Sequence, residues 1–221
     1  MATRRVSAPI LSLAALWLCC FVAPAQGAYV KGATASETYY ASLAATEALA
    51  DFGPWYYAGP FDNTDGRGFA AVYAPEQGLD LRDTYEGKGG RTVRWQRGAA
   101  FRDGEVNSLN IFPDNDWIAV YLWRTITVSE ARELPVLLGS DDGITVWLNG
   151  EQVLAHNVGR ACMLGDERLS LSLRPGRNDL LLKVTQGAGP AGFAFAVDHG
   201  PDALLTRIAR DFPGEVNALL V

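Results

Sequence analysis

Apolar and polar residues alternate with a period of two along most of the chain between residues 55 and 197. The clearest run is IAVYLWRTITV at residues 118–128, where isoleucine, valine and leucine occupy one face and Tyr121 and Trp123 occupy the other. A two-residue period is typical of a β-strand. This part of the chain is therefore expected to form strands rather than helices.

Turn residues separate the alternating runs at short intervals. Gly139–Gly143 (GSDDG) follows one run, Asn149-Gly150 ends the next, and Pro175–Asn178 (PGRN) separates two leucine-rich runs. Asn-Gly is the strongest short hairpin signal. Short strands with turns every 8–12 residues predict an all-β fold, an antiparallel jelly-roll β-sandwich.

Helical periodicity is confined to the two ends. Residues 28–53 predict a linker with a short helix, and residues 201–221 predict a helical tail. Residues 54–200 form the predicted sandwich. A chain of this size supports one sizeable core, so we expect one domain with flanking helices.

Residues 1–27 have the pattern of a secretory signal peptide. Arg4 and Arg5 precede an apolar run that ends in small residues. The run is shorter than a membrane-spanning helix, and no later segment approaches that length. We expect an exported protein, periplasmic or extracellular, with no transmembrane segment after cleavage. The arginine pair is also compatible with a twin-arginine signal, and Cys19 or Cys20 with lipidation.

Charge and composition argue against two classes of function, nucleic-acid binding and catalysis. The chain has a net charge of −6, and loss of the signal removes two arginines and no acids. An acidic protein lacks the basic surface that nucleic acid requires, so no nucleic-acid partner is expected. His156 and His199 stand in no recognised metal or nucleophile motif, so an enzyme is not expected.

Clusters of oxygen donors suggest calcium as the only cofactor. Calcium prefers six to eight oxygen ligands, which carboxylates in turns supply, although the same residues also cap turns with no ion. The candidate ligands are Asp62, Asn63, Asp65, Asp141 and Asp142.

Aromatic side chains make sugar binding the leading functional hypothesis. A pyranose presents an apolar C–H face, which an exposed aromatic ring flanked by polar groups can bind. Core packing is the competing explanation for each large aromatic residue. The candidate ligand-binding residues are Trp55, Tyr57, Trp117, Tyr121, Trp123, Trp147, Asn149 and Arg160.

Several of these motifs resemble a known family. The segments Gly139–Gly143, Val146–Gly150 (VWLNG) and Leu173–Val184 (LRPGRNDLLLKV) resemble the galactose-binding-like β-sandwich, including the sugar-binding modules of glycoside hydrolases. Asp141 and Asp142 also resemble the acidic pair of PA14 lectin domains, which holds calcium and, through it, sugar hydroxyls. Both resemblances imply a secreted, non-catalytic glycan-binding module. The alternative is a structural or protein-interaction subunit that binds an envelope protein.

Overall fold

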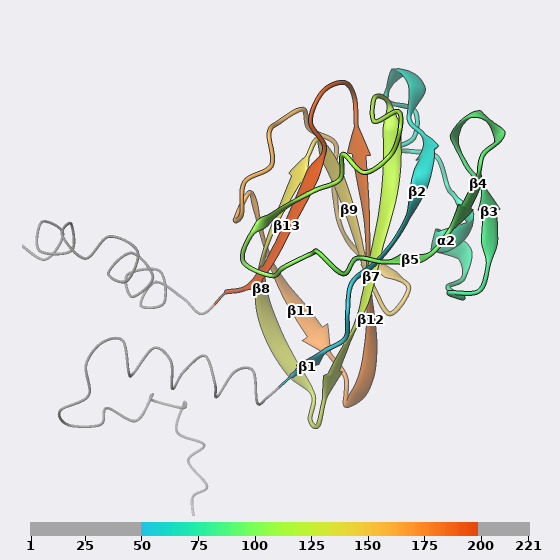
Figure 1. The fold of residues 1–221 in the computed structure, drawn as a ribbon. Helices are drawn as coiled ribbons and strands as arrows, with labels where there is room; N and C mark the ends of the chain where they lie inside the picture. The colour runs from blue at the N-terminus through green and yellow to red at the C-terminus, as the bar shows by residue number, and fades with distance from the viewer. Residues whose placement is uncertain (1–49, 199–221) are drawn as a thin grey trace, which may run out of the picture.

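The computed structural model describes residues 50–198, and the structural statements below concern that range. Antiparallel strands dominate it, arranged mainly in two sheets that lie face to face (Figure 1). The prediction of an all-β sandwich is therefore confirmed, while its jelly-roll topology remains a prediction. The predicted signal peptide, the body of the N-terminal linker and the C-terminal tail lie outside the described residues.

The larger sheet contains seven strands, and its long central strands are β7 and β12. Along the sheet the order is β10 (Glu151–His156), β9 (Gly143–Leu148), β12 (Gly176–Gln186), β7 (Ile118–Val128), β2 (Tyr56–Asp62) and β5 (Gln96–Arg97), with β1 (Asp51–Phe52) also paired to β7. The smaller sheet has the order β11 (Glu167–Leu173), β8 (Arg132–Asp141), β13 (Gly192–Val197) and β6 (Val106–Ser108).

The main core lies between these two sheets. Ile118, Val120 and Leu122 point into it from β7, and they meet Phe193 and Phe195 of β13. All five side chains are almost completely buried. The alternation in the sequence therefore identified the inward face of β7 correctly.

A second core covers the opposite face of the larger sheet. Tyr121, Trp123 and Trp147 lie there against Tyr85 and Trp95. These last two belong to a covering layer, which we define as residues 69–95. It contains α2 (Ala74–Gln77), the 3₁₀ turn η2 (Lys88–Gly90), β3 (Thr84–Glu86) and β4 (Thr92–Arg94). In Figure 1 this layer lies outside β2, on the side away from β8 and β13.

The turn within the GSDDG segment is shorter than its run of turn-type residues suggests. β8 extends to Asp141 and β9 begins at Gly143, so Asp142 alone separates the two strands. β8 belongs to the smaller sheet and β9 to the larger one. The segment is therefore a corner between sheets, and its Asp141–Asp142 peptide bond is cis.

Two asparagines explain the other turn motifs. The Asn149 amide donates to Asn178 Oδ1 at 2.9 Å, and Asn149 Oδ1 accepts from the backbone N–H of Asp179 at 3.0 Å. Asn178 is fully buried, and its amide nitrogen donates to the carbonyl oxygens of Arg174 and Ile126. The Asn-Gly hairpin and the Pro-Gly-x-Asn turn are thus joined by side-chain hydrogen bonds.

A pocket beside Trp117 is the candidate functional site

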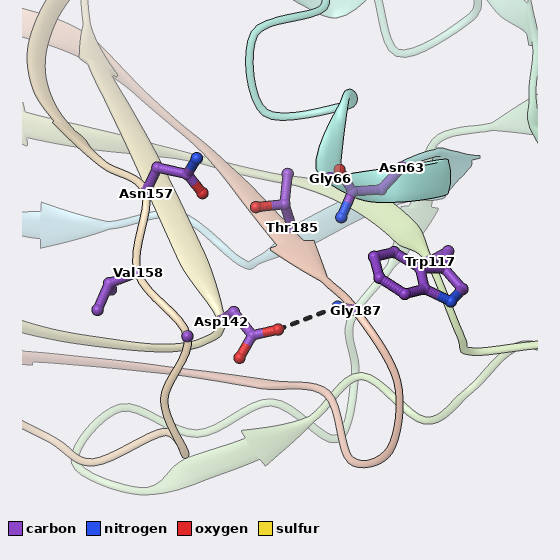
Figure 2. Close-up of a pocket in the computed structure, with 9 residues that line it drawn as sticks. Asn63, Gly66, Trp117, Asp142, Asn157, Val158, Thr185 and Gly187 are labelled. Carbon is purple, nitrogen blue, oxygen red and sulfur yellow. Dashed lines mark hydrogen bonds between the residues drawn. The ribbon is translucent and has the colours of Figure 1, made fainter.

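A pocket of about 200 Å³ opens at the end of β12, close to the corner at Asp142 (Figure 2). Its walls come from loops that follow β2, β10 and β12 and from the residue that precedes β7. Segments that are far apart in sequence therefore build it. The lining residues are Asn63, Gly66, Trp117, Asp142, Asn157, Val158, Gly159, Thr185 and Gly187.

Trp117 supplies the large apolar surface of the pocket, and 41% of this residue is exposed. Its backbone has a φ of 52°, in the left-handed region that bulky residues seldom adopt. Two backbone hydrogen bonds hold it there: its N–H donates to Gly187 O, and its carbonyl accepts from Asn63 N–H at 2.9 Å. Such conformations persist where surrounding contacts determine them, and they concentrate at functional sites.

Asp142 provides the only charged side chain among the lining residues. Oδ1 accepts from the backbone N–H of Arg160 at 3.0 Å, and Oδ2 accepts from the backbone N–H of Gly187 at 3.0 Å. Each carboxylate oxygen has a second lone pair. The carboxylate is therefore fixed in position by the backbone and can still accept hydrogen bonds from a ligand.

Asn63 lines the pocket, but its amide oxygen is buried beside Gly68. The residue is only 4% exposed, and its amide nitrogen donates to Gln186 O at 2.9 Å. Its Oδ1 atom has no hydrogen-bond partner in the structure, and neither does the buried Oε1 atom of Gln186. Burying an acceptor without a donor is unfavourable. Because these oxygens have essentially no accessible surface, a ligand in the pocket does not reach them.

The acidic pair Asp141–Asp142 lies at a corner that Arg160 holds in place, and its two carboxylates have different surroundings. The Arg160 guanidinium bonds to Glu167 Oε1 at 2.7 Å and to Ser140 Oγ at 2.9 Å, so it braces the corner from outside the pocket. Burial, together with the neighbouring Asp142 carboxylate, raises the pKa of Asp141. The negative charge of Asp142 is thus stabilised by two backbone N–H donors. That of Asp141 is less well stabilised, because the side chain is partly buried beside another carboxylate.

Four of the proposed ligand-binding aromatics are buried, which corrects that prediction. Trp55 packs on Phe193 and Phe195 in the main core. Tyr121, Trp123 and Trp147 lie under the covering layer. None of these four rings offers a face to solvent on which a sugar could stack.

Three further candidates have structural partners away from the pocket. The Tyr57 ring packs against Phe101 and Phe112, and its hydroxyl donates to Gln96 at 3.0 Å. Asn149 joins the two turns described above, and the Arg160 side chain braces the corner. Of the eight predicted ligand-binding residues, Trp117 alone lines the pocket.

The predicted calcium ligands divide between the pocket and the surface. Asn63 and Asp142 line the pocket, whereas Asp65 is exposed and paired with Arg67 at 3.3 Å. Asp62 accepts from the backbone N–H and hydroxyl of Thr64. Among residues 50–198, no group of three or more histidine, cysteine, aspartate or glutamate side chains comes together as a metal site. The described side chains alone therefore do not form a calcium shell, and calcium remains a prediction.

Sequence reasoning missed Asn157, Thr185 and Gly187. Thr185 is one of the polar residues of a strand, and Asn157 follows a strand end. Nothing in their spacing indicates that they converge with Trp117, because the convergence results from β2, β7, β10 and β12 ending at one place. Gly187 has a specific role: a Cβ atom there would lie 3.4 Å from Asp142 Oδ2 and 3.8 Å from Trp117 Cζ3. The glycine keeps the space between these two groups open.

Comparison with known proteins finds similarity in structure alone. No protein-family model matches the sequence. No curated protein matches it either.

Several solved structures resemble the chain at low identity. An α-xylosidase of Xanthomonas citri aligns with 66% of this chain at 11% identity and a TM-score of 0.39, and the alignment spans only 15% of that enzyme. A family 35 carbohydrate-binding module aligns with 46% of this chain and 82% of the module, at 13% identity and a TM-score of 0.32. The PA14 domain of an antifreeze protein aligns with 69% of this chain and 68% of the domain, at 15% identity and a TM-score of 0.32.

The similar structures include both kinds of domain that the sequence motifs resemble, a sugar-binding module and a PA14 domain. TM-scores below 0.5 do not identify a ligand. The function must therefore be argued from the Trp117 pocket.

Proposed function

We propose that the protein is a non-catalytic module that binds a sugar ring in the Trp117 pocket. The observation that carries the proposal is the exposed Trp117 ring beside the fixed Asp142 carboxylate. The ring suits the C–H face of a pyranose, and the oxygens suit its hydroxyl groups.

The size of the pocket favours a single ring. Its volume of about 200 Å³ is below the roughly 300–1,000 Å³ typical of pockets for drug-sized ligands. A chain of several sugars would therefore place one residue in the pocket and the others on the surface outside it.

The chemistry of the lining supports binding rather than hydrolysis. Glycoside hydrolysis by the usual mechanism uses two carboxyl groups on opposite sides of the scissile bond. Among the described residues that line the pocket, Asp142 is the only carboxylate, and both of its oxygens already accept backbone hydrogen bonds. We assign the pocket no catalytic step.

Calcium forms a second part of the proposal, at the Asp141–Asp142 corner. A cation there would offset two adjacent negative charges, one of which is poorly solvated in the folded state. Because these side chains supply too few oxygens for a full shell, backbone carbonyls, water or the sugar would complete it. Calcium is not required for the stacking and hydrogen-bonding argument above.

A glycan screen with and without a calcium chelator tests the proposal. The informative variants are Trp117→Ala, which removes the ring, and Gly187→Ala, which places a methyl group between the ring and Asp142. Gly187 lies outside the positive-φ region, so alanine retains its backbone hydrogen bonds without strain. Gly78→Ala is the matched control, because a Cβ atom there has no neighbour within 4 Å.

The expected result is binding by the wild type and the Gly78→Ala variant, with loss of at least about tenfold in affinity, or 1.4 kcal/mol, in the other two. Absence of glycan binding in both conditions, together with co-purification of a stoichiometric protein partner, would instead favour an envelope-protein interaction.

Export to the periplasm or the medium is also part of the proposed function. It rests on the signal-like sequence of residues 1–27. N-terminal sequencing of protein recovered from each cell fraction tests it, and an uncleaved protein in the cytoplasm would contradict it. Within residues 50–198, no helix has the length and apolar character to cross a bilayer.

A further inference from the structure

The described residues that line the Trp117 pocket supply several hydrogen-bond acceptors and no cationic side chain. Its polar groups are the Asp142 carboxylate, the amides of Asn63 and Asn157 and the Thr185 hydroxyl. Figure 2 shows Asn63, Thr185 and Asn157 along one side of the pocket and Asp142 facing them. The Asp142 carboxylate accepts one backbone hydrogen bond on each oxygen and can accept more. A hydroxyl group of a ligand can donate to it, whereas a carboxylate can only accept and is repelled by its charge.

Basic side chains near the pocket are engaged elsewhere. Lys88 Nζ lies 3.1 Å from Asp114 Oδ2 and also contacts the carbonyl of Asp116. Arg67 pairs with an exposed acid, and the Arg160 guanidinium bonds to Glu167. No guanidinium or ammonium group among the lining residues is therefore available to neutralise an acidic ligand.

We propose that this pocket selects an uncharged, hydroxyl-bearing sugar ring and rejects the same ring when it carries a carboxylate. Asp142 is the specificity-determining residue, because its carboxylate accepts from a ligand hydroxyl and repels negative charge. This inference rests on the proposed sugar-binding function and adds the charge class of the ligand.

Matched sugars test the inference directly. Methyl glycosides of glucose, galactose and mannose are titrated by calorimetry beside the methyl glycosides of the corresponding uronic acids. Each pair shares its ring stereochemistry and differs in the carboxylate. We expect each neutral sugar that binds to do so at least about tenfold more tightly than its acidic counterpart, because two like charges a few ångströms apart repel in a partly enclosed site. The preference is expected in the presence of a chelator, because calcium at the Asp141–Asp142 corner would offset the charge of Asp142.

A charge-reversal variant provides a second measurement. Asn157 is exposed at the pocket, so Asn157→Lys adds a cation to the lining without disturbing a core. We expect this variant to lower the ratio between the affinity for a neutral sugar and the affinity for its uronic acid by at least about threefold. Gln152→Lys is the control, since it adds the same charge to an exposed residue of β10 that does not line the pocket, and it should leave the ratio unchanged.

The possible outcomes separate this inference from the proposed function. Binding of a uronic acid as tightly as its neutral counterpart in the presence of the chelator would overturn the charge selection while leaving sugar binding intact. An unchanged ratio in Asn157→Lys would also overturn it. Failure of all six sugars to bind with and without calcium would refute the proposed function itself.

Discussion

Replacing Lys183 by methionine tests how the covering layer is held on the larger sheet. Lys183 projects from the outer face of β12, and its side chain is only 3% exposed. Its ammonium group lies 2.8 Å from Glu76 Oε1 in α2 and 2.9 Å from the carbonyl of Ala71. Tyr121 donates to the same Glu76 oxygen. The cluster therefore joins the first part of the covering layer to two central strands.

The expected cost follows from the burial of both charges. Lys183→Met leaves the Glu76 carboxylate, 11% exposed, without its cation. Removing one partner of a buried ion pair costs about 3–5 kcal/mol, whereas replacing both by apolar residues is often neutral or stabilising. We expect Lys183→Met to lower the free energy of unfolding by about 3–5 kcal/mol. The double variant Lys183→Met/Glu76→Leu should recover most of that loss.

Urea unfolding followed by tryptophan fluorescence measures these differences, because Trp123 and Trp147 lie under the covering layer. Arg82→Met is the matched control in the same layer. Arg82 pairs with Asp80 at 2.6 Å, but its side chain is 89% exposed. Exposed pairs contribute little to stability, so this variant should unfold like the wild type.

Two results would refute the reasoning. One is a Lys183→Met variant that unfolds within about 1 kcal/mol of the wild type, which is far less than a buried unpaired carboxylate should cost. The other is a double variant whose loss equals the sum of the two single losses, because the residues would then not be energetically coupled.

Three further predictions concern the acidic corner and the turn network. The raised pKa of Asp141 means that folding favours its protonated form, so its favourable contribution exists at low pH and is lost as pH rises through the raised pKa. Asp141→Asn should therefore raise the Tm at pH 7, with a gain that shrinks as the pH is lowered towards about 4, the ordinary carboxyl range; a gain independent of pH would contradict this explanation. Added calcium should raise the Tm of the wild type more than that of Asp141→Asn, and equal shifts would place the ion elsewhere. Asn178→Ala should cost at least about 2 kcal/mol in urea unfolding, because buried backbone groups lose their partners, and a loss no larger than that of the less buried Asn115→Ala would show that the turn network contributes little.

The strands could be predicted from the sequence, and most of the pocket could not. The alternation in residues 118–128 identified β7, and Asn149-Gly150 identified the β9–β10 hairpin. The pocket combines Asn63, Trp117 and Asn157, which lie on separate loops. No period or motif relates these positions, because loop ends meet through the order of strands in a sheet.

The environment of the outward face of β7 could not be predicted from the sequence either. Its aromatic residues are compatible with either an exposed ligand platform or a second core. The covering layer, residues 69–95, has only short strands, one turn of α-helix and one 3₁₀ turn, so its local sequence does not signal that it buries those rings. A buried ion pair and the side chains of Tyr85 and Trp95 hold it in place.

By itself, the sequence determined the class of structure, the inward face of the central strand and the positions of the turns, because these depend on residues within one short segment. Only the tertiary structure decided which tryptophan remains exposed and what stabilises the acidic pair. Asp142 is fixed by backbone N–H groups of Arg160 and Gly187, which lie 18 and 45 residues away along the chain. Contacts over such separations depend on how the sheets pack, and that information is not contained in any local pattern.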